Sequence, residues 1–224
     1  MTSGFLLIDK PAGPTSHDVV AKIRRILATP KVKVGHTGTL DPAATGLMIL
    51  VLGSYTKRAG EFSKLDKTYD VEATLGAVSA TGDIQGPISR VSDRQPSEAE
   101  IRKTLKMFLG RQQQTPHPHS AIKVAGQRAY KLARAGQHVK IEPRTITIYG
   151  ISRIKYAYPR LKFTVKVSSG TYIRSLVEDI GQKLATGAYL SALRRTKVGD
   201  FNITDAIPIE NLEAKTIQTN LERL

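Results

Sequence analysis

Apolar residues recur along the chain with the spacing of strands in some stretches and of helices in others. The run Phe5–Asp9 predicts a short strand, and the apolar run Leu47–Leu52 predicts a buried one. Alternation of apolar and polar residues predicts a strand over Thr68–Leu75. Two more strands are expected around a turn at Tyr158-Pro159: Thr145–Tyr156 and Leu161–Ser168.

Helical spacing of apolar residues predicts amphipathic helices between these strands. Ser16 is a suitable N-cap for a helix over His17–Ala28. Ser97 and Glu100 have the spacing of a capping box ahead of a second helix, and Gly110 suits the C′ position that ends it. Three further helices are expected, the last of them short: Arg128–Ala135, Thr171–Leu184 and Leu190–Arg195.

The predicted strands and helices follow one another in mixed order, which favours an α+β fold with a largely antiparallel sheet. A chain of 224 residues suits one large domain, or one domain plus a small appendage. We expect this domain to cover residues 1–201, because residues 202–224 are too few for a second domain with its own core. The chain has no Cys, which excludes disulfides, thiolate metal sites and a cysteine nucleophile.

The charge is strongly basic and unevenly distributed. The chain has 34 Lys and Arg against 19 Asp and Glu, and residues 120–175 hold 12 of the basic side chains with one acidic residue, Glu142. Such a surface is typical of a protein that binds a polyanion, although a basic face kept for solubility would look the same. We find no apolar run long enough for a bilayer and no targeting signal, so we expect a cytoplasmic protein.

A stretch of small residues, Gly35–Gly46, directly precedes the predicted buried strand and contains one carboxylate, Asp41. Its glycines allow the backbone to approach a ligand closely, and Pro42 restricts Asp41 to an extended conformation. One interpretation is a carboxylate held still over a reacting group, and the other is an ordinary Asp-Pro turn. The stretch lacks the spacing of a phosphate-binding P-loop.

Two further stretches contain candidate functional residues. Ser168–Arg174 joins a predicted strand to a helix, where free N–H groups attract anions, and Arg174 could bind a phosphate or a carboxylate or lie exposed. Tyr69 could stack on a nucleobase or be a half-buried strand tyrosine. His117 and His119 have no carboxylate cluster nearby in sequence, so no metal site is expected.

Together these motifs resemble those of the tRNA pseudouridine-55 synthases, the TruB type. Gly35–Gly46 is similar to the catalytic motif of that family, and Leu7–Ser16 is similar to its first motif. Lys67-Thr68-Tyr69 matches the motif with the active-site tyrosine. Three more stretches resemble family motifs in the same order: Ser120–Tyr130, Ser168–Arg174 and Ala192–Thr196. The resemblance covers about residues 4–201.

The resemblance implies the pseudouridine-synthase fold, with a mixed, mostly antiparallel central sheet, flanking helices and an RNA-clasping insertion around Lys123–Arg134. It implies an isomerase that flips one uridine out of the T-loop of tRNA, at tRNA position 55, and moves the ribose from nitrogen to carbon. The implied partner is the T-arm of tRNA, with no metal, cofactor, membrane or protein partner, and we expect a monomer. Residues 202–224 would be a short tail without the PUA domain of many relatives.

The resemblance also assigns roles to single residues. Asp41 would be the catalytic carboxylate, Tyr69 would stack on the flipped uracil, and Arg174 would pair with Asp41 and keep it ionised. The other implied site residues are Tyr172 and Leu193 in the base pocket, His36 at the T-loop, Lys10 and Pro11 in support of the catalytic loop, and Lys123 and Arg128 in the insertion.

Two alternatives from other functional classes remain. The chain could be a non-catalytic RNA-binding or RNA-folding module, which would not need Asp41. It could also be a general basic binder without a base pocket, whose affinity for any polyanion would fall steeply as salt rises.

Overall fold

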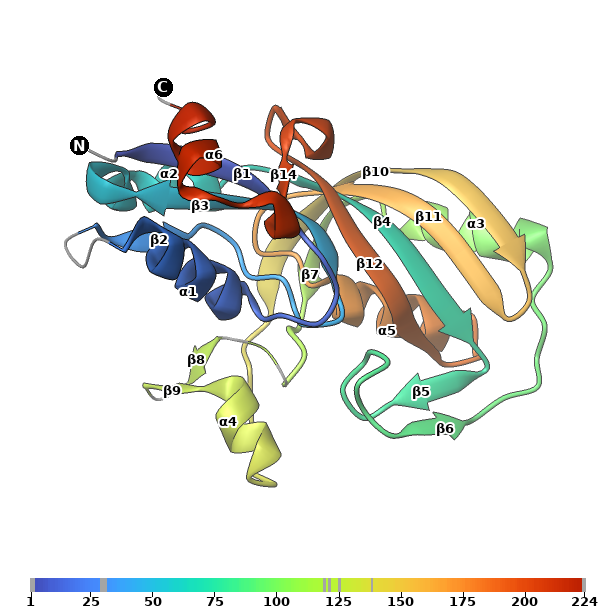
Figure 1. Cartoon of the computed structure of the whole chain (residues 1–224). Coiled ribbons are helices and arrows are strands. Elements are labelled where there is room, and N and C mark those ends of the chain that lie inside the picture. Colours follow the sequence, from blue (N-terminus) through green and yellow to red (C-terminus); the bar gives the residue numbers. More distant parts are fainter. Residues whose placement is uncertain are drawn as a thin grey trace. The chain divides into compact units, whose positions relative to one another are not determined.

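The computed structural model describes residues 3–28, 32–118, 120, 122–124, 126–137 and 139–222 (Figure 1). The chain divides into two compact units. Unit 1 comprises residues 1–70 and 193–224, and unit 2 comprises residues 71–192. The chain passes from one unit to the other inside two strands, β4 (Lys67–Leu75) and β12 (Ala188–Val198).

Unit 1 contains both ends of the chain and the strand order β14-β1-β3-β12-β4, with β2 paired to β3 and β13 to β12. Besides its parts of β4 and β12, its elements are β1 (Gly4–Lys10), α1 (Ser16–Leu27), β2 (Val34–His36), β3 (Thr45–Leu52), the 3₁₀ helix η1 (Gly53–Arg58), α2 (Ala59–Ser63), β13 (Phe201–Asn202), η2 (Ile203–Asp205), β14 (Ile207–Pro208), η3 (Ile209–Asn211) and α6 (Ala214–Thr219).

The core of unit 1 forms around the antiparallel pair β1 and β3, which are buried on both faces. This explains why both read as nearly continuous apolar runs rather than as alternating ones. On one face, aromatic rings gather around Phe5, with Phe62 and Phe201 each at a centroid distance of 5.2 Å. Helix α1 contacts β2 and buries Val19 and Ile23.

Unit 2 has the strand order β12-β4-β11-β10-β7. Besides its parts of β4 and β12, its elements are β5 (Ala77–Ser79), β6 (Ile88–Arg90), α3 (Glu98–Met107), β7 (Gly110–Gln114), β8 (Lys123–Val124), β9 (Gln127–Arg128), α4 (Ala129–Arg134), β10 (Arg144–Ala157), β11 (Arg160–Val167) and α5 (Ile173–Lys183).

Strands β10 and β11 form an antiparallel hairpin around the cis peptide Tyr158-Pro159. Leu161, Phe163 and Val165 alternate with exposed or half-buried residues, so one face of β11 enters the core of unit 2. The buried residues of α5 and α3, such as Leu176 and Ile101, belong to the same unit. Unit 2 thus follows the period-2 and helical patterns from which its elements were predicted.

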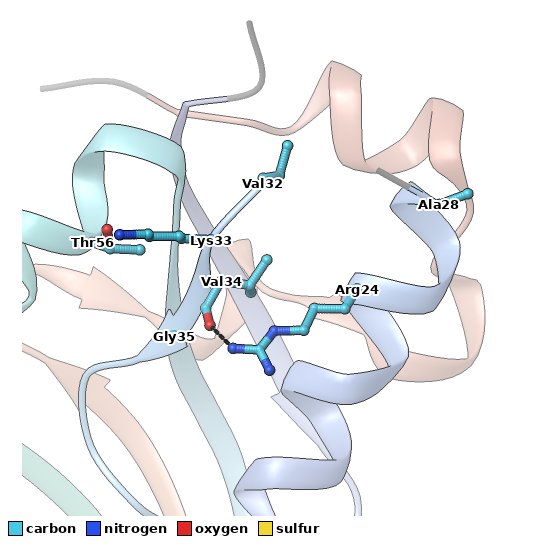
Figure 2. A pocket seen from close by; sticks show the side chains of 7 residues that line it. All are labelled: Arg24, Ala28, Val32, Lys33, Val34, Gly35 and Thr56. Atoms are coloured by element: carbon cyan, nitrogen blue, oxygen red, sulfur yellow. Dashed lines mark hydrogen bonds between the residues drawn. The ribbon is translucent and has the colours of Figure 1, made fainter. Parts of the chain in front are cut away.

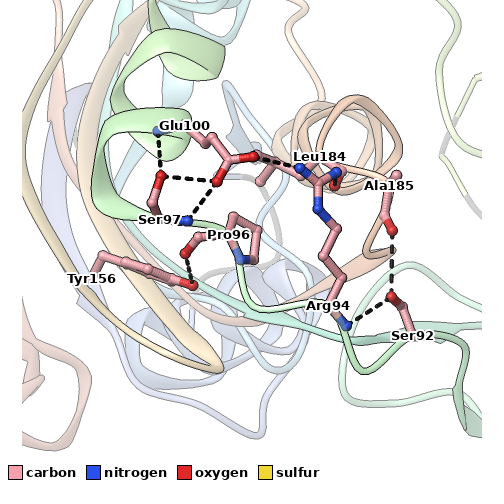
Figure 3. A network of polar contacts seen from close by, with 8 residues as sticks. All are labelled: Ser92, Arg94, Pro96, Ser97, Glu100, Tyr156, Leu184 and Ala185. Carbon is pink, nitrogen blue, oxygen red and sulfur yellow. Dashed lines mark hydrogen bonds and ion pairs between the residues drawn. The ribbon is translucent and has the colours of Figure 1, made fainter.

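A polar network fixes the start of α3 (Figure 3). The Ser97 hydroxyl accepts from the Glu100 N–H at 3.3 Å, and the Glu100 carboxylate accepts from the Ser97 N–H at 2.7 Å, which completes the predicted capping box. The Tyr156 hydroxyl of β10 donates to the Pro96 carbonyl at 2.8 Å. Arg94 donates to the Leu184 carbonyl at the end of α5 at 2.7 Å, so the network joins three elements of unit 2.

The α+β class and the mixed, mostly antiparallel sheet are confirmed, with helices beside the strands in both units. The short helix predicted at Leu190–Arg195 is wrong, because these residues lie in strand β12. Its pairing partners come from distant β3, with Arg194 opposite Thr45, and a short apolar run does not itself distinguish the two structures.

Two helix ends also differ from the prediction. The N-cap of α1 is Thr15 rather than Ser16, because the Thr15 hydroxyl accepts from the Asp18 N–H at 3.1 Å. Helix α3 ends at Met107 with Phe108 as C-cap, and Gly110 begins β7 instead of occupying C′. Leu109, between the C-cap and β7, is 47% exposed.

Residues 202–222, expected to be a tail, belong to unit 1. Strand β14 pairs in parallel with β1, and Glu222 and Phe5 form an antiparallel bridge. Residue Ile217 of α6 is fully buried. Among the described residues, no helix combines the length and apolar character that crossing a bilayer requires.

The capping box of α3 gives a first prediction. Replacing Ser97 by Ala should lower the free energy of unfolding by about 1 kcal/mol, because the Glu100 N–H loses its acceptor. Chemical denaturation monitored by circular dichroism measures this. The control is Ser89→Ala in strand β6, an exposed position outside any helix cap. Equal stability of the Ser97→Ala and Ser89→Ala proteins would contradict a stabilising cap.

Candidate catalytic site

Asp41 lies in a loop without regular secondary structure, residues 37–44, between β2 and β3 of unit 1. We call it the Asp41 loop. Thr37, Leu40 and Ala44 of this loop are buried, whereas Asp41 is only half-buried. A buried loop must find hydrogen-bond partners for its backbone outside itself. The elements that supply these partners therefore decide where the carboxylate of Asp41 lies.

The first partner is Lys10 at the end of β1. Its ammonium donates to the carbonyls of Ala44 at 2.7 Å, Pro11 at 2.8 Å and Pro42 at 3.2 Å. The side chain is fully buried, and this burial lowers the pKa of Lys10 from 10.5 to about 8, while the charge of Asp41 acts in the opposite direction. The predicted support of the loop by Lys10 has this geometric basis.

The second partner is Ser16, the first residue of α1. Its hydroxyl donates to the Leu40 carbonyl at 2.9 Å and accepts from the Leu40 N–H at 2.8 Å. The residue before Asp41 is thereby fixed at both of its backbone groups. The Gly13 N–H adds a bond to the Pro42 carbonyl at 2.9 Å, so the predicted first motif packs directly on the Asp41 loop.

The third partner is Arg195 of β12. Its Nε donates to the Leu47 carbonyl at 2.7 Å, and its Nη2 donates to the Gly38 carbonyl at 3.0 Å. The side chain is 2% exposed. Sequence reasoning missed this residue as a site residue, although it lies in the recognised stretch Ala192–Thr196, because its partners are 148 and 157 positions away.

Tyr69, His36, Pro11 and Leu193 lie in the same unit. Tyr69 is 8% exposed and points to the buried side of β4. Burial lowers the pKa of His36, and the nearby charges of His17 and Arg195 act in the same direction. Among the described residues, the buried Nδ1 of His36 has no hydrogen-bond partner. The Leu193 carbonyl accepts from the Thr45 hydroxyl at 3.4 Å.

The start of α5 in unit 2 carries the second predicted group, and Tyr172 is its N-cap. The Gln114 side chain holds Tyr172 from both sides: its oxygen accepts from the Tyr172 N–H at 2.8 Å, and its nitrogen donates to the Tyr172 carbonyl at 3.0 Å. The Arg144 guanidinium lies 5.6 Å from the centroid of the Tyr172 ring. Gln114 is 3% exposed, and sequence reasoning did not single it out.

Arg174 follows Tyr172 by two residues and is 7% exposed. Its Nη1 donates to the Thr81 carbonyl at 2.9 Å and lies 3.8 Å from the carboxylate of Asp83. Asp83 is itself buried and accepts from the Thr81 hydroxyl at 2.6 Å. Arg174 is therefore not an exposed helix residue. The expected pairing with Asp41, which belongs to the other unit, stays a prediction.

The predicted RNA-clasping insertion is a small hairpin followed by a helix. Strands β8 and β9 pair with Lys123 opposite Arg128, and α4 follows directly. The Arg128 side chain is exposed. The side chain of Lys123 lies outside the described part of the structure. The role of both residues in RNA binding stays a prediction.

A groove of about 710 Å³ lies elsewhere in unit 1 and is lined by residues of α1, the start of β2 with the two residues before it, and η1 (Figure 2). Arg24 crosses it and donates to the Val34 carbonyl at 2.7 Å. Its lining consists of Arg24, Ala28, Val32, Lys33, Val34, Gly35 and Thr56, so none of the predicted site residues is among its described lining. The hydrogen bonds around Asp41, not this groove, mark the candidate site.

Comparison with known proteins identifies the family. A family model described as the N-terminal domain of TruB family pseudouridylate synthases matches residues 24–173. A second model, described as the C-terminal domain of tRNA pseudouridylate synthase B, matches residues 174–224. The chain belongs to the TruB family of pseudouridylate synthases.

Individual relatives agree with this assignment. The chain is 43% identical to a tRNA pseudouridine synthase B of Opitutus terrae, over 99% of this chain and 91% of that protein. It is 44% identical to a tRNA pseudouridine synthase B of Cupriavidus taiwanensis, over 95% of this chain and 68% of that protein. The family resemblance derived from the sequence motifs is thereby confirmed.

Solved structures support the fold. A chain in the crystal structure of a Cbf5-Nop10-Gar1 complex superposes with a TM-score of 0.74 at 32% identity, covering 94% of the TruB-family chain described here. A chain of an H/ACA RNP bound to a substrate RNA containing 2'-deoxyuridine gives a TM-score of 0.70 at 30% identity over 93%. The chain spans 54% and 52% of those two solved chains.

The contacts of Lys10 with the Asp41 loop of this TruB-family chain give a second prediction. In Lys10→Met, the carbonyls of Pro42 and Ala44 lose a donor, so the free energy of unfolding should fall by about 1–3 kcal/mol. Hydrogen exchange should accelerate at the amides of Gly13 and Ala44, whose acceptors are the carbonyls of Pro42 and Asp41.

The matched control for this prediction is Lys64→Met, which removes an exposed lysine from the same unit. It should leave both amides and the stability unchanged. Unaltered exchange at Gly13 and Ala44 in a folded Lys10→Met protein would show that Lys10 does not hold the loop.

Proposed function

We infer that this chain is a tRNA pseudouridine synthase, an isomerase that converts one uridine in the T-loop of tRNA, at tRNA position 55, to pseudouridine. The observation that carries this is the 43% identity to a tRNA pseudouridine synthase B over 99% of the chain and 91% of the relative. The structure is consistent with this inference, because hydrogen bonds from Lys10, Ser16 and Arg195 hold the partly buried segment that contains Asp41.

The reaction needs only groups that side chains can supply. The bond between C1′ of the ribose and N1 of uracil breaks, and a bond between C1′ and C5 forms. The hydrogen on C5 leaves as a proton, and N1 gains a proton, so product and substrate have the same composition. Since the base must first leave its stack, the enzyme needs a pocket for the extruded base and contacts that hold the RNA open.

We propose that Asp41 is the catalytic carboxylate and that Tyr69 stacks on the flipped uracil. Burial of Tyr69 on the inner side of β4 supports a fixed ring orientation. Arg174 would supply a fixed guanidinium, and its bond to Thr81 and its proximity to Asp83 support that role, because they restrict the guanidinium before substrate binds. Thus three residues from separate parts of the sequence share the chemistry.

The remaining residues would hold the RNA. Tyr172, kept in position by Gln114, and Leu193 would line the base pocket. His36 would contact the T-loop. In support of this, its buried Nδ1 has no hydrogen-bond partner among the described residues. Lys10 and Pro11 would stabilise the loop, and Lys123 and Arg128 would grip the T-arm backbone. We also propose that the enzyme acts as a monomer in the cytoplasm without a protein partner.

The direct test follows tritium. A synthetic T-arm hairpin with tritium on C5 of its uridines is mixed with the protein, and tritium released to water is counted. The wild type should release about one equivalent per hairpin, because only one uridine loses its C5 hydrogen. Asp41→Asn should release none while it still binds the hairpin, since the amide keeps the shape of the side chain but cannot act as a carboxylate.

Other outcomes separate the alternatives. Release by neither protein from the hairpin or from full-length tRNA, with binding intact, would favour a non-catalytic RNA-binding module. Equal affinity for an unrelated hairpin of the same length would favour a general polyanion binder. Release by Asp41→Asn at the wild-type rate would contradict the role of Asp41.

The pKa of Lys10 gives a pH-dependent prediction. Burial lowers this pKa to about 8, so the ammonium that holds Pro42 and Ala44 loses its proton as the pH rises through that value. The rate of tritium release from bound hairpin should therefore fall above about pH 8. Single-turnover rates between pH 6 and pH 10 measure this limb.

The free energy of unfolding should rise over the same pH range in which the rate falls. The pKa of Lys10 is about 8 in the folded protein and 10.5 in the unfolded chain, so between these values the unfolded chain binds more protons. The contribution of Lys10 to stability therefore rises with pH. Burial also lowers the pKa of Lys67 to about 8, so Lys67→Met is the matched variant and should keep the alkaline limb. A limb that disappears in Lys67→Met, or one that parallels unfolding, would contradict the assignment to Lys10.

A further inference from the structure

We propose that Arg195 is a positioning residue for the isomerisation: its guanidinium ties the start of the Asp41 loop, at Gly38, to strand β3, which follows the loop, and thereby fixes the carboxylate of Asp41. This inference rests on the proposed function, because it concerns the rate of that reaction. Arg195 lies in β12, whose strand pairs in parallel with β3 at the point where the loop ends.

The two hydrogen bonds of Arg195 span the loop. Gly38 lies before Asp41 and Leu47 lies after it, and the one guanidinium donates to the carbonyls of both. A planar guanidinium fixes the angle between its donors, so the two carbonyls are held in a defined relation to each other. A single ammonium in the same place could not impose this geometry. The guanidinium of Arg195 thus links the backbone before Asp41 to the backbone after it.

Two glycines of the loop region make room for this arginine. A Cβ atom on Gly46 would lie 2.3 Å from the Arg195 carbonyl oxygen, and Gly46 has φ +105°. A Cβ atom on Gly38 would lie 3.3 Å from Nη1 of Arg195. Glycine at Gly46 is therefore required by the close approach of the Arg195 backbone and by the positive φ, whereas a side chain at Gly38 would crowd the Arg195 guanidinium.

Lys10 and Ser16 hold the interior of the same loop. Lys10 donates to Pro42 and Ala44, and Ser16 is bonded to Leu40. Arg195 acts outside these positions, at Gly38 near the start of the loop and at Leu47 in β3. The backbone on both sides of Asp41 is therefore held by donors from β1, α1 and β12. A loop held in this way has little freedom to move its carboxylate.

The burial of Arg195 is hard to explain by stability alone. Among the described residues it forms no ion pair, and the guanidinium of this side chain, which is 2% exposed, donates to two backbone carbonyls. A buried cation without a carboxylate partner is a poor stabiliser, because its desolvation opposes folding. A role in fixing the loop explains why a cation rather than an apolar side chain occupies this position.

The neighbouring arginine provides a matched control. Strand alternation sends Arg194 to the other side of β12, where its side chain is 41% exposed. Its guanidinium binds the Asp9 carboxylate through two bonds, at 2.6 and 3.1 Å. Arg194 and Arg195 thus have the same chemistry in adjacent positions of one strand, but Arg195 donates to the carbonyls of Gly38 and Leu47, whereas Arg194 donates to Asp9.

The test compares Arg195→Met, Arg195→Lys and Arg194→Met. Single-turnover tritium release with excess enzyme gives the rate on bound RNA, and filter binding gives the dissociation constant of the T-arm hairpin. We expect Arg195→Met to lower the rate by about 100-fold, the effect of misplacing a reacting group by about 1 Å, with the dissociation constant changed less than about threefold. Arg195→Lys should recover part of the rate, and Arg194→Met should stay near the wild type.

Circular dichroism and cooperative unfolding show which variants are folded. If Arg195→Met does not fold, Arg195→Lys decides, since it keeps the charge but not the fork: a rate at least about tenfold below the wild type with unchanged affinity supports the proposal. A folded Arg195 variant with a wild-type rate overturns it. A rate loss matched by an equal loss of RNA affinity, or an equal loss in Arg194→Met, overturns it as well. If the wild type itself releases no tritium, the proposed function fails instead.

Discussion

The backbone carbonyls of the Asp41 loop need donors, and nearly every feature of unit 1 around this loop follows from that need. The loop has no regular secondary structure of its own, yet it is partly buried, where an unpaired carbonyl is costly. The donors arrive from β1, α1 and β12, at sequence separations of 34, 24 and 157 residues. The position of one carboxylate is therefore a property of the whole unit.

The same constraint explains what the sequence could predict. Residue types pointed to the right loop, because glycines around a single Asp-Pro are visible locally. The strands β10 and β11 were also predictable, because alternation is a local pattern. Local patterns do not show which distant side chain bonds to a loop carbonyl. Ser16 was therefore interpreted as a helix cap, whereas its hydroxyl is bonded to Leu40 and Thr15 caps the helix.

Strand β12 illustrates the limit most clearly. Leu190–Arg195 was predicted as a helix. In a helix the side chains of Arg194 and Arg195 would have been only about 100° apart around the axis. In the strand they point to opposite sides, one toward Asp9 and one toward the loop. The error in secondary structure thus concealed a site residue. Pairing with β3, a contact between distant segments, decides both the strand and the direction of Arg195.

At the start of α5, as in the Asp41 loop, side chains from distant segments form hydrogen bonds with the backbone next to a proposed site residue. Sequence reasoning emphasised the N–H groups of its first turn as an anion site, but the Tyr172 N–H already donates to Gln114. Asp83, which was not among the predicted site residues, lies near Arg174 and accepts from Thr81. In both units a side chain proposed for chemistry is oriented by buried polar groups of neighbouring segments. Since such groups act only when the fold is complete, the geometry of the site is tied to the folded state.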